Sequence, residues 1–396
     1  MNQTFRVVFN RARGALMVAN EVTSSVQKKG TKTMVAVAAA AMMVGSAMAE
    51  DAEIVVPKKE AVAVTPSMTV TTPTVAENSA KANTGLFVVY DELAAVVTGN
   101  SDFGASAAVG EGAQASYTMK EEGQNQFGLN GGSYSGFTAA NGNETAAAGG
   151  SIFGVYGASI NAKVEGVTFE DNTASRGGVG YVRSDKTFEV TGSTHTNNTS
   201  TGSAGVYDLH GLNGSLTATI TGSKFEGNKA TANAGAIRAE KTALTIKDSE
   251  FKNNVATGTE GKNGRGGAIE AINGSKLTVE NTTFDGNSAI QGGAVLADNS
   301  TLVFTDTTFT NNTAQAWGGA VRFWQDNQTE GSDVTFAVTE GKDIAYVGNK
   351  AGQDEALAEK YADMGGLLYM GTAGKVDFAM EKDATLTIGE ASATDK

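Results

Sequence analysis

The chain has 396 residues, with 50 glycines, 3 prolines, no cysteine and a formal net charge of −13. The lack of cysteine excludes a disulfide scaffold and a thiolate metal site, and the negative charge argues against a nucleic-acid partner. Many glycines with few prolines exclude collagen and a proline-rich disordered chain. Ala, Gly, Thr and Val dominate while Leu, Ile and Phe are sparse, which favours many thin β layers over one thick core.

Residues 1–49 read as a secretory signal segment that lies outside the fold. Basic residues at Lys28, Lys29 and Lys32 precede an apolar run from Met34 to Val44, and 47–49 reads Ala-Met-Ala. The apolar run is too short to span a bilayer as a helix, and the small residues predict cleavage after Ala49. The alternative is a buried N-terminal helix.

The first 21 residues, MNQTFRVVFNRARGALMVANE, resemble the extended signal peptide region of Gram-negative type V secreted proteins, the autotransporters. The matching positions are Met1, Asn2, Phe5, Arg6, Val7, Asn10, Gly14, Val18 and Glu21. Phe9, Gln3 and Asn20 replace the usual Trp, Lys and Ser. The resemblance implies export through the inner- and outer-membrane machinery to the cell surface, outer membrane or medium, with the periplasm as a stage in transit.

The segment 50–84 holds all three prolines and is expected to be an extended, flexible leader. Residues 85–126 are expected to cap the first coil of a solenoid that begins at residue 127, because an open solenoid edge recruits other strands. Within this cap region, 87–97 (FVVYDELAAVV) fits either a strand or a short helix.

The segment 127–390 is built from repeats, and 391–396 is a tail. The clearest copy is FDGNSAIQGGAV at 284–295, with others at 309–321 and 251–269. Looser copies lie at 169–179, 225–237 and 346–368, a worn one has His195, Asn198 and Gly205, and faint ones begin at Phe127 with Asn130 and at 149–152. A third, alternating segment such as LTIKDSE from Leu244 separates the copies. A helix-prone insertion at 353–363 is expected to protrude as a loop.

The spacing predicts the fold. Steps of 26, 33 and 25 residues separate the phenylalanines from Phe225 to Phe309, and each unit holds three short runs of strand character. Propeller blades and α-solenoids need about 34 to 50 residues per unit. We therefore expect a parallel β-helix of about nine or ten coils, about 4.8 Å apart.

The repeated residues then have structural roles. The phenylalanines are expected to stack inside the solenoid, the asparagines to turn the chain in the left-handed region or to bond one another as a ladder, and the glycine pairs to form tight corners. This predicted ladder comprises Phe169, Asn172, Phe225, Asn228, Phe251, Asn254, Phe284, Asn287, Phe309, Asn312, Gly266, Gly267, Gly292, Gly293, Gly318 and Gly319, with further corners at Gly177 and Gly365. A functional role for them is the less favoured alternative.

The FxxN and GGA[IV] pairing resembles the repeats of chlamydial polymorphic membrane proteins and other autotransporter passengers. That resemblance implies a surface-exposed right-handed parallel β-helix, a pectin-lyase-like solenoid, which is often an adhesin or host-interaction module with an unknown host or cell-surface ligand. No pattern of a translocator barrel is present before the final SATDK. We therefore expect either a truncated or fragmentary product or an anchor located elsewhere.

The motifs of β-helix enzymes are missing. The chain has no Asp-Asp pair with a downstream Arg-x-Lys, no Gly-Asp-Ser-Gly and no GxxxxGK[ST]. Asp248, Glu280 and Asp306 are placed at equivalent positions of successive coils, where they form either a calcium-binding stripe or, more simply, a solvated face. His195 occupies a phenylalanine position and is expected to pack; His210 is the other histidine. We expect no enzyme, no cofactor and no metal, with a β-helix polysaccharide lyase or hydrolase as the least favoured alternative.

An aromatic group beside a glycine pair supplies the candidate binding residues Trp317 and Trp324, since exposed Trp is enriched at recognition sites. Strand alternation places Phe323 and Trp324 on opposite faces, so one of them is expected to be exposed. The remaining alternative is a structural spacer or a self-associating surface rod.

Overall fold

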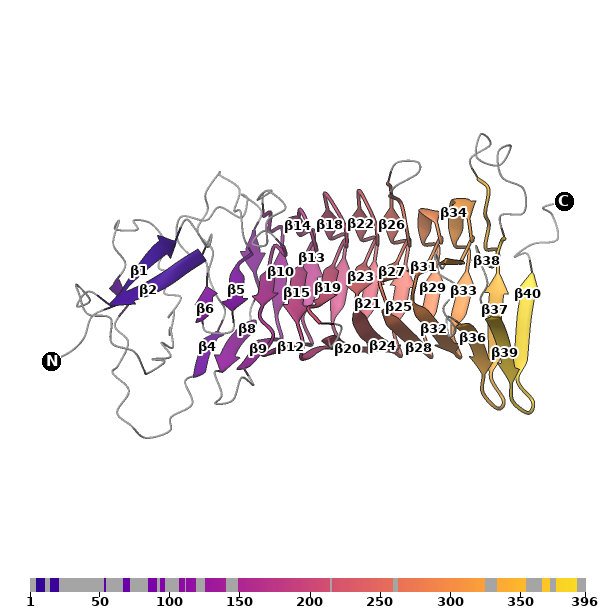
Figure 1. The fold of residues 1–396 in the computed structure, drawn as a ribbon, viewed down its shortest axis with the longest axis horizontal. Helices are drawn as coiled ribbons and strands as arrows, with labels where there is room; N and C mark the ends of the chain where they lie inside the picture. The colour runs from indigo at the N-terminus through magenta and orange to yellow at the C-terminus, as the bar shows by residue number, and fades with distance from the viewer. Residues whose placement is uncertain are drawn as a thin grey trace.

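The computed structural model describes residues 5–10, 15–20, 53–54, 67–71, 85–90, 93–96, 107–110, 112–118, 125–139, 149–213, 216–258, 263–324, 333–353, 365–370 and 375–389. Most of these residues form a rod of stacked strands (Figure 1). In the leader, β1 (Phe5–Asn10) and β2 (Ala15–Asn20) pair antiparallel, and β3 (Glu53–Ile54) pairs with β1. The predicted cleavage site at Ala49 and nearly all of the insertion at 353–363 lie outside the described residues.

Three long sheets run the length of the rod. Sheet 1 contains β6 (Leu93–Val96), β5 (Phe87–Tyr90), β11 (Phe153–Tyr156), β15 (Gly180–Ser184), β19 (Tyr207–Gly211), β23 (Ile237–Glu240), β27 (Ile269–Ile272), β31 (Val295–Asp298), β35 (Val321–Trp324) and β38 (Leu368–Met370). Sheet 2 contains β4 (Ser67–Thr71), β8 (Gln114–Thr118), β9 (Asn125–Asn130), β12 (Ile160–Glu165), β16 (Thr187–Thr191), β20 (Leu216–Thr221), β24 (Thr242–Lys247), β28 (Lys276–Glu280), β32 (Thr301–Thr305), β36 (Asp333–Val338) and β39 (Lys375–Met380). Sheet 3 contains β7 (Ala108–Val109), β10 (Ser133–Ser135), β13 (Thr168–Glu170), β17 (Thr194–Thr196), β21 (Lys224–Glu226), β25 (Glu250–Lys252), β29 (Thr283–Asp285), β33 (Thr308–Thr310), β37 (Asp343–Val347) and β40 (Thr385–Gly389).

The chain visits the sheets in a fixed order, so each circuit is one coil. Strands of successive coils pair in parallel and in register, as Phe225 with Phe251 and Phe251 with Phe284 in sheet 3. Each long sheet has nine such parallel strands among the described residues, once the antiparallel β4, β6, β7 and β8 are set aside. The predicted β-helix and its coil count are confirmed.

A fourth, shorter sheet was not predicted. Sheet 4 contains β14 (Thr173–Ala174), β18 (Thr199–Ser200), β22 (Lys229–Ala230), β26 (Val255–Ala256), β30 (Ser288–Gln291) and β34 (Thr313–Trp317). Four of these strands have only two residues, too few for an alternating pattern to be read from sequence. The sheet lies between sheet 3 and the corner that leads back to sheet 1.

The N-terminal end corrects two expectations. Residues Ser67–Thr71 belong to the predicted flexible leader, but they form β4, which pairs antiparallel with β8 along sheet 2. The sequence suggests Phe127 as a first copy of the FxxN phrase; it instead aligns with Ala162 in sheet 2, and Tyr134 fills the aromatic position beside Phe169. A single aromatic followed by Asn does not distinguish the two sheets.

The glycine pairs make the corner before sheet 1. The first glycine of each pair has a positive φ, as predicted, for example 65° at Gly292 and 68° at Gly318. A Cβ on the second glycine would strike the next coil, since one at Gly293 would lie 2.0 Å from the Gly319 carbonyl oxygen. Ala204 and Ala234 occupy the first position in two coils, with φ of 64° and 58°.

Candidate functional site

The interior of sheet 3 is a column of aromatic rings. Phe225, Phe251, Phe284 and Phe309 are fully buried, with ring centroids 4.6, 4.9 and 5.0 Å apart and interplanar angles of 11° or less. Phe169, also fully buried, continues the column at the other end, 5.4 Å from the ring of His195. Each ring covers the apolar face of the preceding coil. The column has a structural role.

A row of asparagines at the next corner forms a continuous ladder, buried except at its half-buried last member, Asn349. From Asn172 to Asn312 each side-chain Nδ2 donates to the Oδ1 of the next asparagine at 2.9–3.0 Å, and from Asn172 to Asn349 each Nδ2 also donates to a carbonyl oxygen of sheet 3 one coil back. Each Oδ1 also accepts from a backbone N–H. The members are Asn172, Asn198, Asn228, Asn254, Asn287, Asn312 and Asn349. The ladder satisfies backbone groups that would otherwise be buried without partners.

The left-handed turn is made by a different residue. The ladder asparagines are expected from sequence to adopt the left-handed region themselves, but positive φ occurs at the residue before each of them, as at Asn253 (53°) before Asn254 and Asn311 (56°) before Asn312. This preceding residue is exposed or half-buried, whereas the ladder asparagine points inward. The expectation was wrong because the residue in the turn keeps its side chain on the outer side, whereas the ladder amide has to lie inside the solenoid.

His195 packs as predicted. Its ring lies between Phe169 and Phe225, 4.3 Å from and nearly parallel to the latter. Nδ1 lies 2.9 Å from the Lys224 carbonyl oxygen, which can only accept, so Nδ1 carries the proton and Nε2 accepts from the Tyr207 hydroxyl at 2.6 Å. Burial lowers the pKa of His195 to about 3, partly offset by the Lys224 hydrogen bond. This imidazole is neutral at physiological pH.

The outer face of sheet 1 carries a cluster of charged side chains that was not predicted from the sequence. Its members, called here the sheet 1 ion cluster, are Arg176, Asp208, His210, Arg238, Glu240 and Glu270. Asp208 Oδ2 accepts from Arg176 Nε at 2.8 Å, while Asp208 Oδ1 lies 2.7 Å from His210 Nε2. Arg238 reaches Glu240 at 2.7 Å and Glu270 at 3.3 Å.

Burial and charge act against each other in this cluster. Burial raises the pKa of Asp208, but His210, Arg238 and Arg176 outweigh it and hold that pKa below its ordinary value. Burial lowers the pKa of His210, and Asp208 with Glu240 reverse the shift, so this pKa lies above its ordinary value. For Glu270 burial wins over the nearby arginines and raises the pKa to about 7.

The cluster is closed rather than open to a substrate. The side chains of Asp208 and Glu270 are 0% and 1% exposed, and Arg238 lies between them with 13%. Two carboxyl groups whose pKa values differ strongly, as those of Asp208 and Glu270 do, are typical of general acid–base catalysis. A general acid must also reach an atom of the substrate, however, and these two side chains are buried. The ion pair between Arg176 and Asp208 links the corner before sheet 1 in one coil to the sheet 1 strand of the next coil. One sequence signal marks it: Asp208, Arg238 and Glu270 occupy the same position of successive strands.

The predicted acidic stripe does not form. In sheet 2, Glu280 pairs with Lys247 and Thr305. Asp248 and Asp306 each come one residue later, in the corner where φ is positive. The Glu280 carboxylate binds Lys247 Nζ at 2.7 Å. The offset of one residue sends Glu280 in another direction from the other two acids. Within the described part of the chain, no group of three or more acids and histidines is arranged so that it could hold a metal ion, and no helix is long and apolar enough to span a membrane.

The two tryptophans flank a single arginine. Arg322 lies 5.8 Å from the ring of Trp317 and 5.0 Å from that of Trp324, in cation–π contact with both. Phe323 is fully buried, while Trp324 on the opposite face is half-buried. Trp317 also packs with a small second core of Ile290 and Ala316. Both tryptophans are half-buried, and Trp324 lies outside that second core.

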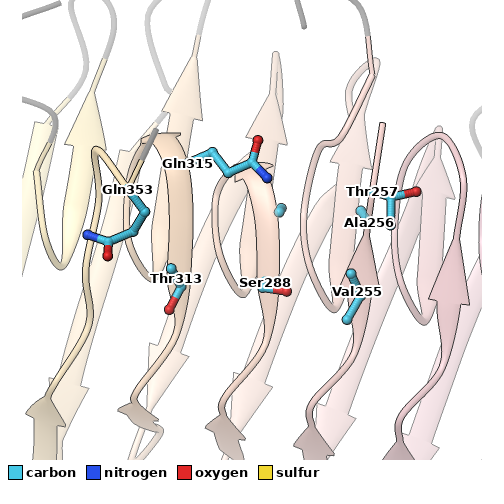
Figure 2. Close-up of a pocket in the computed structure, with 8 residues that line it drawn as sticks. Val255, Ala256, Thr257, Ser288, Thr313, Gln315 and Gln353 are labelled. Carbon is cyan, nitrogen blue, oxygen red and sulfur yellow. The ribbon is translucent and has the colours of Figure 1, made fainter. Parts of the chain in front are cut away.

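A groove of about 400 Å³ lies on the outer side of sheet 4. Figure 2 shows its lining residues spread over neighbouring coils, with Gln315 extending over the coil that carries Ser288. The lining consists of Val255, Ala256, Thr257, Ser288, Ala289, Thr313, Gln315 and Gln353. None of these residues is ionisable. The groove was not predicted from the sequence, because it depends on sheet 4, which was not predicted either.

Comparison with known families matches two parts of the chain. Residues 1–50 match the family described as Extended Signal Peptide of Type V secretion system, and residues 151–336 match the family described as Right handed beta helix region. No curated protein and no solved structure matches the chain. The first match indicates export toward the outer membrane or cell surface, and the second gives the hand of the solenoid. Together they support a right-handed β-helix that is the secreted passenger of an autotransporter.

Proposed function

We propose that this chain is a surface-exposed autotransporter passenger that acts as an adhesin or host-interaction rod. The observation that carries the proposal is the combination of a type V export leader at 1–50 with a β-helix at 151–336 in one chain. The FxxN and GGA[IV] repeats, which resemble those of chlamydial polymorphic membrane proteins, favour the same role. A long rod with regular faces presents a large area for contact.

We further propose that the rod binds and does not catalyse. Three acids of the sheet 1 ion cluster have strongly perturbed pKa values. Asp208 and Glu270 are buried beside Arg238, which leaves them out of a substrate's reach, and the partly exposed Glu240 is held by Arg238 at 2.7 Å. The groove on sheet 4 and the half-buried Trp324 are accessible but lack an ionisable pair. The accessible surfaces are suited to contact with a ligand, whereas the charged groups with perturbed pKa values are shielded from it. Both observations favour binding over catalysis.

The proposal is tested by protease shaving of intact producing cells, followed by mass spectrometry of the released peptides. Peptides from 151–336 are expected in the medium while a soluble periplasmic marker stays intact. If these peptides appear only after the outer membrane is permeabilised, the chain does not reach the surface and the proposal fails.

A contact role for Trp324 is tested by Trp324→Ala. We expect weaker attachment of producing cells to host-cell monolayers, with an unchanged melting temperature, because the ring lies outside the core. Phe323→Ala, one residue away on the inner face, is the matched comparison and is expected to lower the melting temperature instead. Unchanged attachment of the Trp324 variant to every surface that the wild type recognises would remove Trp324 from the contact.

A self-associating rod is the second candidate, favoured by the last described coil. There Phe378, Met380 and Ile388 are 48%, 44% and 56% exposed, the exposed large apolar side chains among the described residues. Strands β38, β39 and β40 are also the edge strands of their sheets, and exposed strand edges recruit further strands. Mixing tagged and untagged producing cells separates the candidates, since self-association clumps the two populations without host cells.

A further inference from the structure

The groove on sheet 4 is a row of side chains in register. Val255, Ser288 and Thr313 pair across successive coils and occupy equivalent positions on β26, β30 and β34. The same row continues to Lys229 on one side and Lys350 on the other. The groove therefore lies in an uncharged section of this row, between the two lysines.

The groove arises where sheet 4 changes shape. β26 has two residues, while β30 and β34 have four and five, with a register shift between Ala289 and Gln291. Because β30 and β34 are longer than β26, they extend beyond its end, and Gln315 on β34 lies above the floor of the groove. Figure 2 shows Gln315 and Thr257 on opposite sides of the β30 coil. The hollow therefore results from the backbone, and no single rotamer creates it.

The lining has two chemical parts. Val255, Ala256 and Ala289 give an apolar floor, and hydroxyl and amide groups surround it. Among the described residues the Ser288 hydroxyl and the Gln315 amide make no hydrogen bond within the chain, and Gln353 uses only its Nε2, toward the Ala351 carbonyl at 3.2 Å. These groups can both donate and accept toward a ligand.

We propose that this groove binds a neutral oligosaccharide, which would make such a glycan the contact ligand of the proposed adhesin. A sugar ring offers an apolar C–H face to the floor and hydroxyls to the rim. The volume of about 400 Å³ lies within the range of about 300–1,000 Å³ usual for small-ligand sites. Coils about 4.8 Å apart offer a polymeric ligand one contact set per coil.

Other occupants fit less well. An anionic chain would meet no cation among the eight lining residues. A peptide strand cannot extend sheet 4 from the groove, because the floor strands β26 and β30 already pair on both sides. Recognition here must use side chains, and the available ones offer hydroxyl and amide groups around a small apolar floor, which match the hydroxyls and the C–H face of a neutral sugar.

The test measures binding of soluble full-length protein to maltohexaose, cellohexaose and chitohexaose by calorimetry, with hexagalacturonate as the anionic comparison. Ser288→Tyr fills the groove from an outward position, and Gln315→Ala removes a rim amide. Thr199→Tyr is the matched control, since Thr199 occupies the same row three coils away. Melting temperatures of all three variants report folding.

We expect at least one neutral hexasaccharide to bind, with affinity about tenfold lower in Ser288→Tyr and about fivefold lower in Gln315→Ala, and unchanged in Thr199→Tyr. If Ser288→Tyr fails to fold, Gln315→Ala decides. Absence of binding by all neutral probes, preference for hexagalacturonate, or equal loss in Thr199→Tyr would overturn the proposal. Because the assay uses soluble protein, its failure leaves the surface location, tested by shaving, untouched.

Discussion

The inner column of sheet 3 and the outer ion cluster of sheet 1 use the same stacked register in opposite ways. Inside, like residues repeat: Phe lies on Phe from Phe225 to Phe309, and Asn bonds Asn from Asn172 to Asn349. Outside, complementary residues alternate, so Asp208, Arg238 and Glu270 neutralise one another. Identical rings and amides attract their own copies, whereas identical charges repel. The interior is therefore periodic in sequence, and the charged face is not.

The largest effect is expected from breaking the inner column. Phe251→Ala removes a fully buried ring between Phe225 and Phe284, and we expect a loss of about 3–5 kcal/mol of unfolding free energy. Urea denaturation followed by circular dichroism measures it. Lys252→Ala, whose side chain points outward, is the control and should change stability by less than about 0.5 kcal/mol. Equal effects from both would place Phe251 outside the core.

Breaking the ladder is expected to be nearly as severe. Asn254→Ala removes the side-chain donor to the Phe225 carbonyl and the Oδ1 that accepts from both the backbone N–H and the Nδ2 of Asn228, at a cost of about 3 kcal/mol. Its neighbour gives a sharp control. Asn253→Gly should change stability little, because Asn253 has the positive φ of 53° that glycine adopts freely. A larger loss from Asn253→Gly would contradict the assignment of turn and ladder.

The histidine in the column tests the same region through pH. The folded pKa of His195 is lowered to about 3, below its unfolded value of about 6.5. The unfolded state thus binds the proton first, and stability falls as pH drops below 6.5. From pH 7.5 to 5 we expect the wild type to lose about 2 kcal/mol from this site. His195→Phe should lack that loss, while being less stable at pH 7.5 because the Tyr207 hydroxyl loses its acceptor. An identical pH profile in both proteins would show that His195 is not buried.

The outer cluster should respond in the opposite direction and more weakly. The pKa of Glu270 is raised to about 7, so the folded state binds the proton more tightly and stability falls as pH rises from about 4.5 to 7. Between pH 5 and 6 this site should account for about 1 kcal/mol. Glu270→Gln should be flatter over that interval. A constant difference between the two proteins at pH 5, 6 and 7 would mean that Glu270 is ionised throughout.

The interior was predictable because each coil repeats one phrase. Phe at the start, Asn three residues later and the Gly pair specify the strand, the ladder and the corner independently of the other coils. The same logic failed for the turn, where the residue that adopts positive φ varies between Asn, Asp and Gly. One-residue offsets of this kind also misplaced Glu280 relative to Asp248.

The outer features were not predictable for a physical reason. The partners that join different coils in the sheet 1 ion cluster are 30 and 32 residues apart and differ in type, so a pattern search for identical residues passes over them. The groove depends on the lengths of β30 and β34 relative to β26, which are set by backbone geometry. The Phe323 and Trp324 pair was a partial exception, since alternation alone correctly separated their faces.

The register of the coils underlies the column, the ladder, the ion cluster and the groove, and engineered cysteines test it directly in a chain with no native cysteine. Thr245 and Thr278 are paired neighbours on the outer face of sheet 2, whereas Val279 points into the core. Paired strands lie about 4.8 Å apart, within disulfide range. Exported protein with cysteines at 245 and 278 should form an internal disulfide, and protein with cysteines at 245 and 279 should not. Efficient bonding only of the second pair would contradict the β-helix register.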